Sequence, residues 1–154
     1  MSLLPIVMHP DPRLRQVCSA VEVFDDGLAQ LAADMCDTMY HAQGRGLAAP
    51  QVGDLRRIFV FDAEWKQGAP CPFVCVNPVI TALGEETRTV PEQCLSIPDQ
   101  PVAVTRPARI SLVWQDVTGA RHRQEFGGDA AVIVQHEADH LEGRLVLDYL
   151  EETP

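Results

Sequence analysis

The apolar positions after residue 27 recur every three or four residues, which is the period of an α-helix. They are Leu28, Leu31, Ala32, Met35, Cys36 and Met39. Asp25 or Asp26 can cap the start of this helix, and Gly44 can end it. The sequence therefore predicts an amphipathic helix in the first third of the chain.

The residues from 58 to 126 follow a different pattern, in which short β-rich runs are separated by proline and glycine. The runs span 58–61, 73–76, 102–105, 110–115 and 122–126. Thr118 and Gly119 lie between the last two runs and are typical of a hairpin turn. We expect these runs to form antiparallel strands.

A second helix is predicted between Asp129, near its start, and Gly143, which can end it. Its first half is an apolar run from 130 to 134, so we expect it to be buried under sheet. Near the start of the chain, Pro10 and Pro12 favour an ordered loop over a helix. The elements together predict an α+β fold, with antiparallel sheets surrounding the second helix and the first helix packed outside.

A chain of 154 residues with 46% hydrophobic residues can bury one core, and we expect a single domain over residues 1–154. The net charge of −10 repels phosphate backbones and anionic lipids, so nucleic acid and membrane surfaces are poor partners. Five cysteines at irregular spacing favour reduced thiols over a disulfide framework. With no signal peptide or membrane-spanning run, the expected location is cytoplasmic.

His136, Glu137 and His140 form an H-E-x-x-H pattern on the second predicted helix. Histidines four residues apart lie on one face of a helix, so both rings can reach one metal ion, and Glu137 can reach water beside it. A solvated helix face with two spare histidines is the simpler explanation. The apolar run before them argues for burial instead, where such polar groups are costly without partners.

A catalytic metal site normally has three protein ligands, so a third must be found. The chain has Val146 where a metzincin has a histidine, and too few residues follow His140 for a downstream glutamate ligand. The third ligand is therefore expected upstream. Cys94 is the strongest candidate because a thiolate binds borderline-soft ions well, and His41 and His122 are the alternatives.

A segment rich in small residues, 44–51, follows the first predicted helix. Gly44 and Gly46 allow a ligand to approach the backbone closely, and Gln51 offers an amide donor to a developing oxyanion. Considered alone, a glycine-rich helix exit is usually only a turn.

These three segments together resemble the sequence motifs of the peptide deformylases. The family motifs G-x-G-x-A-A-x-Q, E-G-C-L-S and Q-H-E-x-D-H have counterparts in the same order at 44–51, 92–96 and 135–140. The opening at 10–14 is also similar to that family, so the resemblance covers nearly the whole chain.

The resemblance implies one divalent ion per chain, Fe(II) natively or Zn(II), Ni(II) or Co(II) as purified. The implied ligands are Cys94, His136 and His140. Glu137 would take a proton from the water that attacks the formyl carbon of an N-formyl-methionyl peptide, and would return it to the leaving amine. Gln51 and the backbone N–H of Leu95 are the implied oxyanion donors.

The resemblance also implies an extended substrate lying along the backbone at Gly44 and Gly46, with its side chain in an apolar pocket. The residues expected to meet the substrate are Gly44, Arg45, Gly46, Glu92, Gln93, Val132 and Ile133, together with the His136 ring. Arg106 is expected to pair with Glu92 and fix the Cys94 loop, and Asp139 to orient a ligand.

Three residues depart from the family pattern. Gln93 replaces the glycine before the ligand cysteine and would strain the backbone if its φ were positive. Asp129 stands where many relatives have a large apolar residue, and Arg45 places a cation near the cleft mouth, where it can meet an anionic substrate group. The sequence also ends without the C-terminal helix associated with ribosome docking in many relatives, so direct ribosome docking is not expected.

The sequence is therefore compatible with three functions. The first is a deformylase acting on nascent formyl-methionyl peptides. The second is a deformylase-like paralogue that hydrolyses another small N-acyl amine, motivated by the three departures. The third is a metal-binding homologue without turnover, which Glu137 and Gln51 argue against because a structural site closes with four ligands and needs no base.

Overall fold

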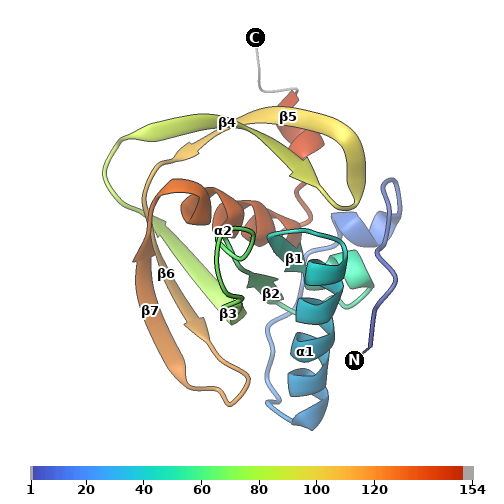
Figure 1. Ribbon diagram of the computed structural model, residues 1–154. Coiled ribbons are helices and arrows are strands. Elements are labelled where there is room, and N and C mark those ends of the chain that lie inside the picture. Colours follow the sequence, from blue (N-terminus) through green and yellow to red (C-terminus); the bar gives the residue numbers. More distant parts are fainter. Residues whose placement is uncertain (1, 151–154) are drawn as a thin grey trace.

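A five-stranded antiparallel sheet forms the middle layer of the computed structural model, which describes residues 2–150 (Figure 1). Its strand order is β1-β2-β3-β6-β7. The strands are β1 (Gly46–Ala48), β2 (Ile58–Phe61), β3 (Phe73–Ala82), β6 (Ile110–Gln115) and β7 (Arg121–Phe126). Residues 1 and 151–154 of the predicted domain lie outside the described part of the chain.

Strand β2 shows why two helices pack on this sheet. Successive side chains of a strand point to opposite faces, and all four residues of β2 are buried. Ile58 and Val60 pack with helix α1 (Asp26–His41), whereas Phe59 and Phe61 pack with helix α2 (Gly128–Leu141). The sheet therefore has an apolar core on each face.

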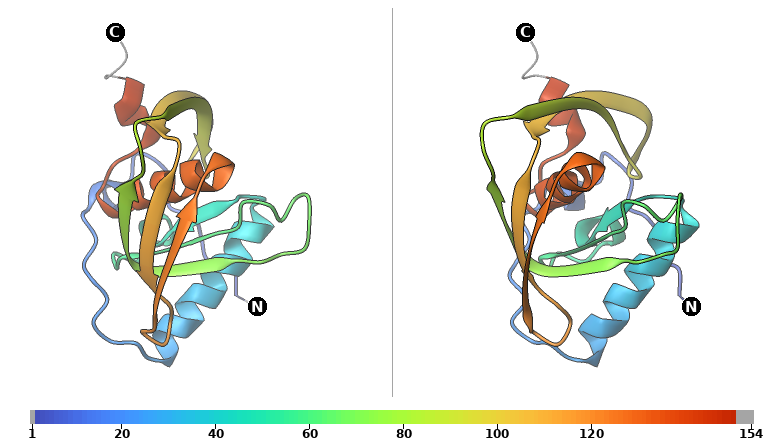
Figure 2. Two further views of the ribbon diagram at one scale, coloured as in Figure 1. Left: turned by 90° about the vertical axis from the view of Figure 1, so that its left-hand side faces the viewer. Right: turned by 60° about the vertical axis from the view of Figure 1, so that its left-hand side comes forward.

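A second, two-stranded sheet arches over α2, so this helix lies between the two sheets (Figures 1 and 2). It consists of β4 (Thr87–Cys94) and β5 (Ile97–Pro107). The 3-10 helix η3 (Val146–Leu150) packs against β5 through a third apolar cluster that includes Ile97, Leu145 and Val146. Nine of the fourteen residues of α2 are buried as a result.

The predicted α+β class is confirmed. The runs 58–61 and 110–115 coincide with β2 and β6, and the other three predicted runs lie inside longer strands. Helix α1 starts at Asp26, where the Asp25 carboxylate accepts a hydrogen bond from the Leu28 N–H at 2.9 Å. Two strands were not predicted: β1 has only three residues, and β4 contains Pro91, which is tolerated because β4 pairs on one side only.

The prediction of a loop at the start of the chain was wrong in part. A second 3-10 helix, η1 (Pro12–Arg15), forms there. Proline is well suited to the first turn of a helix because the missing N–H needs no partner at that position. The Asp11 carboxylate caps the turn by accepting the Arg13 N–H at 2.9 Å.

All five cysteines are free thiols, as expected. Within residues 2–150, neither α-helix has the length and the apolar run needed to cross a bilayer.

Gly143 lies two residues after the end of α2 and has a left-handed backbone with φ +73°. A Cβ atom there would lie 2.7 Å from the carbonyl carbon of Arg15, which is rigid backbone. Gly143→Ala should therefore lower the free energy of unfolding by about 2–4 kcal/mol, from backbone strain and overpacking together. Urea denaturation measures this loss.

Gly84→Ala is the matched control, because Gly84 has φ +70° and no atom within 4 Å of an added Cβ. It should lose only the backbone part, roughly 1 kcal/mol. Equal losses in the two variants would contradict the packing at Gly143.

Candidate metal centre and active site

Helix α2 and the end of strand β4 bring three potential metal ligands together. Cys94, His136 and His140 each offer one donor atom, and these atoms all lie within 4.8 Å of one another. The Cys94 Sγ atom is 3.4 Å from His140 Nε2. Donor atoms about 3.5 Å apart are what a tetrahedral ion with one sulfur and two nitrogen ligands requires. The geometry fits one ion between the three residues.

The two alternative third ligands lie elsewhere. His41 is the last residue of α1. His122 is on β7, where its Nε2 is 2.7 Å from Asp116 Oδ2 and its ring stacks on Trp114. Neither belongs to the ligand cluster found among residues 2–150.

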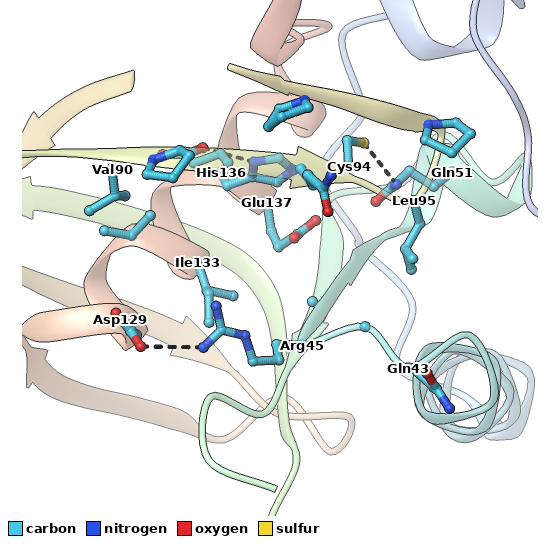
Figure 3. Close-up of a pocket in the computed structure, with 18 of the residues that line it drawn as sticks. Gln43, Arg45, Gln51, Val90, Cys94, Leu95, Asp129, Ile133, His136 and Glu137 are labelled. Carbon is cyan, nitrogen blue, oxygen red and sulfur yellow. Dashed lines mark hydrogen bonds and ion pairs between the residues drawn. The ribbon is translucent and has the colours of Figure 1, made fainter. Parts of the chain in front are cut away.

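Gln51 connects the glycine-rich segment to the Cys94 turn. Its side-chain oxygen accepts the Ala48 N–H at 2.9 Å, which fixes the orientation of the amide. Its Nε2 then donates to Cys94 Sγ at 3.4 Å and to Ser96 Oγ at 3.1 Å. The side chain is buried, so an amide donor is held rigidly beside the candidate ligand sulfur (Figure 3).

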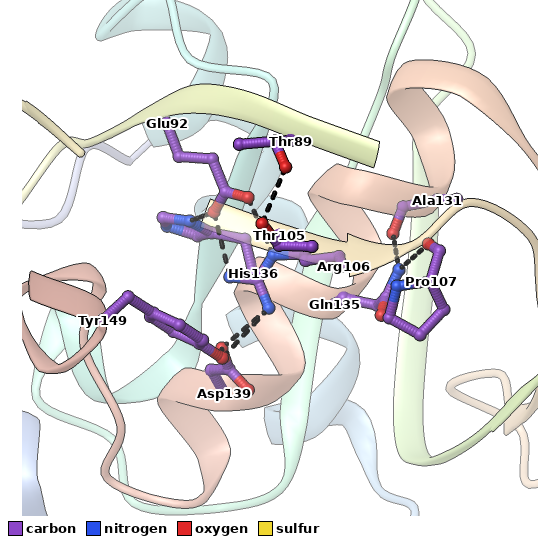
Figure 4. A network of polar contacts seen from close by, with 10 residues as sticks. All are labelled: Thr89, Glu92, Thr105, Arg106, Pro107, Ala131, Gln135, His136, Asp139 and Tyr149. Atoms are coloured by element: carbon purple, nitrogen blue, oxygen red, sulfur yellow. Dashed lines mark hydrogen bonds and ion pairs between the residues drawn. The ribbon is translucent and has the colours of Figure 1, made fainter. Parts of the chain in front are cut away.

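A buried polar network holds the other side of the centre (Figure 4). The Arg106 guanidinium donates to both oxygens of Glu92, at 2.7 and 2.9 Å, and Glu92 Oε1 is 3.0 Å from His136 Nδ1. Arg106 also donates to Asp139 at 2.9 Å, and Asp139 accepts the Tyr149 hydroxyl at 2.7 Å. Glu92 is thus the carboxylate that contacts the candidate ligand His136. Asp139 is linked to this pair through Arg106.

The surroundings of His136 favour a positive charge. Burial acts to lower the pKa of His136, but Glu137, Cys94 and Glu92 outweigh it and raise that pKa to about 10. In contrast, burial keeps the pKa of His140 well below its usual value. The anionic setting of the His136 imidazole and the unprotonated state that burial favours for His140 both suit the binding of a metal cation.

Glu137 directly follows the candidate ligand His136 and is buried. Burial is the main cause that raises its pKa to about 7. Its Oε1 and His140 Nδ1 are buried without a hydrogen-bond partner in the described structure. A buried polar atom without a partner is costly, so a water beside a bound ion would satisfy the carboxylate.

A cleft of about 770 Å³ opens above Glu137, Gln51, Leu95 and the ligand residues Cys94 and His136. Every residue expected to meet the substrate lines it: Gly44, Arg45, Gly46, Glu92, Gln93, Val132 and Ile133.

The backbone at Gly46 packs directly on Glu137. A Cβ atom on Gly46 would collide with Glu137 Oε2 and would lie 2.9 Å from its Cδ. At Gly44 an added Cβ would instead meet the end of the flexible Leu95 side chain, at 2.8 Å. The absence of a side chain at position 46 is therefore what lets the carboxylate lie at the cleft floor.

The strain expected at Gln93 does not occur. Among residues 2–150, the non-glycine residues with positive φ are Gln43, Asn77 and Asp99. Gln93 lies in β4, where Glu92 and Cys94 point inward and its own side chain is exposed. Its side chain is thus an exposed part of the cleft lining and causes no backbone strain.

Sequence reasoning did not single out Ser96 or Tyr149. Ser96 ends the 92–96 motif, and that position is the signal that could have found it, whereas no local pattern marks Tyr149, which reaches the site through Asp139.

Comparison with known proteins agrees with this geometry. A family model described as polypeptide deformylase matches residues 3–154. The peptide deformylase of Zymomonas mobilis is 49% identical over 154 residues, covering 97% of this chain and 87% of the relative. That of Brucella suis is 46% identical over 151 residues, with 97% and 86% covered.

Solved structures give the same result. The peptide deformylase from Thermotoga maritima superposes with a TM-score of 0.90 at 38% identity, covering 96% of this chain and 97% of that one. A probable peptide deformylase from Synechococcus phage S-SSM7 gives 0.87 at 40% identity, covering 95% and 99%. Since the matches span nearly the whole chain, it belongs to the peptide deformylase family.

Proposed function

We propose that this chain removes the formyl group from N-formyl-methionyl peptides and releases formate. The observation that carries the proposal is the convergence of Cys94, His136 and His140 beside the unpaired carboxylate oxygen of Glu137, at the floor of an open cleft. A purely structural metal site would need neither the cleft nor the carboxylate.

One divalent ion per chain would be held by Cys94, His136 and His140. One thiolate and two imidazoles suit Fe(II), Zn(II), Co(II) or Ni(II), and Fe(II) as the native ion stays a prediction. When bound, the ion supplies the Lewis acidity that polarises the formyl group and makes a nearby water acidic.

Glu137 would move the proton. Its Oε1 faces no other donor in the described structure, so it is free to take a proton from the attacking water. The same carboxyl would then deliver this proton to the leaving nitrogen. A pKa of about 7 in the metal-free site keeps the two protonation states close in free energy, as a group that accepts and then donates requires.

Gln51 and the Leu95 N–H would stabilise the developing oxyanion. The Ala48 N–H holds the Gln51 amide in the site before any substrate arrives. Its two N–H groups already point to Cys94 Sγ and Ser96 Oγ, so one of them would have to shift to the oxyanion when the substrate binds. Each donor would be worth about 3 kcal/mol of barrier if it acts like those of other oxyanion holes.

The peptide would lie extended along Gly44 and Gly46, on the exposed edge formed by β1. Val132, Ile133 and the His136 ring line the same cleft and would contact the methionine side chain. A cytoplasmic location and the lack of nucleic-acid and ribosome binding stay predictions.

One observation still favours a paralogue that hydrolyses another small N-acyl amine. Gln93 no longer supports it, because its backbone is unstrained. Arg45 and Asp129 do alter the cleft, since they form an ion pair of 3.3 Å at its mouth.

Glu137→Gln should abolish formate release, with a loss of roughly 10²–10⁴-fold, because the proton carrier is removed. Anaerobically prepared Fe- or Co-loaded protein is given formyl-Met-Ala-Ser, and formate and bound metal are both measured. Metal content should be unchanged. Undiminished turnover in this variant would contradict the role of Glu137, and cleavage of other N-acyl amides without formate release would favour the paralogue.

Gly46→Ala should lower kcat by about tenfold to a hundredfold, because the new Cβ displaces the Glu137 carboxylate while the fold is kept. The matched control is Gly68→Ala, outside this cleft, whose added Cβ meets no atom closer than the Glu64 carbonyl oxygen at 3.7 Å. Steady-state kinetics with the same peptide compare the two. The interpretation fails if both substitutions lower kcat equally.

Glu92→Ala should weaken metal binding by about 10–100-fold, since the His136 ring loses the acceptor that orients it. Competition with a chelator measures the affinity, and circular dichroism checks that the variant is folded. Glu142→Ala removes an exposed carboxylate at the end of the same helix and serves as control. Equal affinities of the two variants would rule out the orienting contact.

A further inference from the structure

Three basic side chains gather at the mouth of the cleft, although the chain has only 12 basic residues against 22 acidic ones. Arg45 and Lys66 line the cleft itself. Arg88, on β4, reaches the same mouth through Asp129, which lies 3.6 Å from its guanidinium. Basic side chains are therefore concentrated at this mouth, although four acidic residues, Glu92, Asp99, Asp129 and Glu137, also line the cleft.

Backbone contacts fix this arrangement. The Trp65 indole donates to the Gly44 carbonyl at 3.0 Å, and the Asp62 N–H donates to the Arg45 carbonyl at 2.9 Å. These bonds hold the loop after β2 against the glycine-rich segment. Lys66, whose ammonium lies 5.7 Å from the Trp65 ring centre, is therefore held near Arg45.

The two arginines share a single carboxylate. Asp129 lies 3.3 Å from Arg45 (Figure 3). It also lies 3.6 Å from Arg88, and its side chain is 62% exposed. Several other arginines have closer partners, such as Asp148 at 2.7 Å from Arg15 and Glu142 at 2.6 Å from Arg57. The Arg45 charge is thus only loosely satisfied.

The other acids of the cleft differ in their exposure and their partners. Glu92 is neutralised by its two bonds to Arg106, and Glu137 is buried at the cleft floor. Asp99, on β5, is the remaining exposed acid that lines the cleft. The cleft is therefore lined by two cations, Arg45 and Lys66, and by two exposed carboxylates, Asp129 and Asp99, while Arg88 adds a third cation beside Asp129.

We propose that this mouth is a subsite for an anionic group of the peptide, namely an acidic side chain close behind the formylated methionine. The proposal rests on the proposed function and names the substrate class of the same cleft. The apolar floor at Val132 and Ile133 remains for methionine, while Arg45 and Lys66 meet the carboxylate. Asp129 competes with that carboxylate for Arg45, because both are acceptors for one guanidinium.

Pairs of formyl peptides that differ only in charge test this. Formyl-Met-Glu-Ser amide is compared with formyl-Met-Gln-Ser amide, and formyl-Met-Ala-Glu amide with formyl-Met-Ala-Gln amide. Amidation leaves the side chain as the only anion. In at least one pair the glutamate peptide should have a kcat/KM about two- to fivefold higher at low salt, the range of an exposed ion pair. About 0.5 M NaCl should bring the ratio toward one.

The variants should move this ratio in opposite directions. Arg45→Gln and Lys66→Gln should lower it, and Asp129→Asn should raise it because the competing carboxylate is lost. Arg109→Gln, which removes an exposed arginine paired with Glu125 at 3.2 Å outside the cleft, should leave it unchanged.

Each result decides between the claims. Equal turnover of glutamate and glutamine peptides at both positions would overturn the subsite while leaving the deformylase function intact. A lower glutamate-to-glutamine ratio of kcat/KM in Asp129→Asn would also overturn the subsite. The Arg45–Asp129 ion pair would then shape the cleft and would not compete with the substrate carboxylate. Absence of formate from every peptide would refute the proposed function, and with it the subsite.

Discussion

Helix α2 buries Gln135, His136, Glu137 and His140 between two sheets, and polar side chains in such a place must find partners. Gln135 donates to two carbonyl groups, and His136 reaches Glu92. Two polar atoms, Glu137 Oε1 and His140 Nδ1, are left without partners in the described structure. The β4–β5 sheet covers α2 and also supplies Glu92, the carboxylate that contacts His136. The fold and the metal centre therefore depend on the same packing.

The dependence of the metal centre on this packing explains why the Arg106–Glu92 ion pair is buried. An ion pair taken out of water stabilises little by itself, and removing one partner leaves a costly charge. Arg106 is shared between Glu92 and Asp139, and Tyr149 closes the network from η3. The network thus links the last described helix to the orientation of one imidazole. We interpret it as a device for positioning and not as a source of stability.

Much of the fold follows from local patterns. The period of α1, the runs of β2 and β6, and the H-E-x-x-H spacing all act over a few residues, so the sequence predicts them directly. Strand β1 has only three residues and β4 carries a proline, so neither has a clear strand pattern of its own. In the site, residue chemistry left Cys94, His41 and His122 open as third ligands, and the motif order pointed to Cys94. Tyr149 could not be found, because only the tertiary fold brings it to the site, whereas Ser96 lay within the second motif and only its contact with Gln51 needed the structure.

The most direct test of the central claim is X-ray absorption spectroscopy of the protein loaded with one equivalent of Zn(II) or Co(II). The arrangement of Cys94, His136 and His140 predicts one sulfur scatterer at about 2.3 Å and two imidazole nitrogens at about 2.0–2.1 Å, with light-atom solvent completing the shell. A spectrum without sulfur, or one with four protein ligands, would contradict the account.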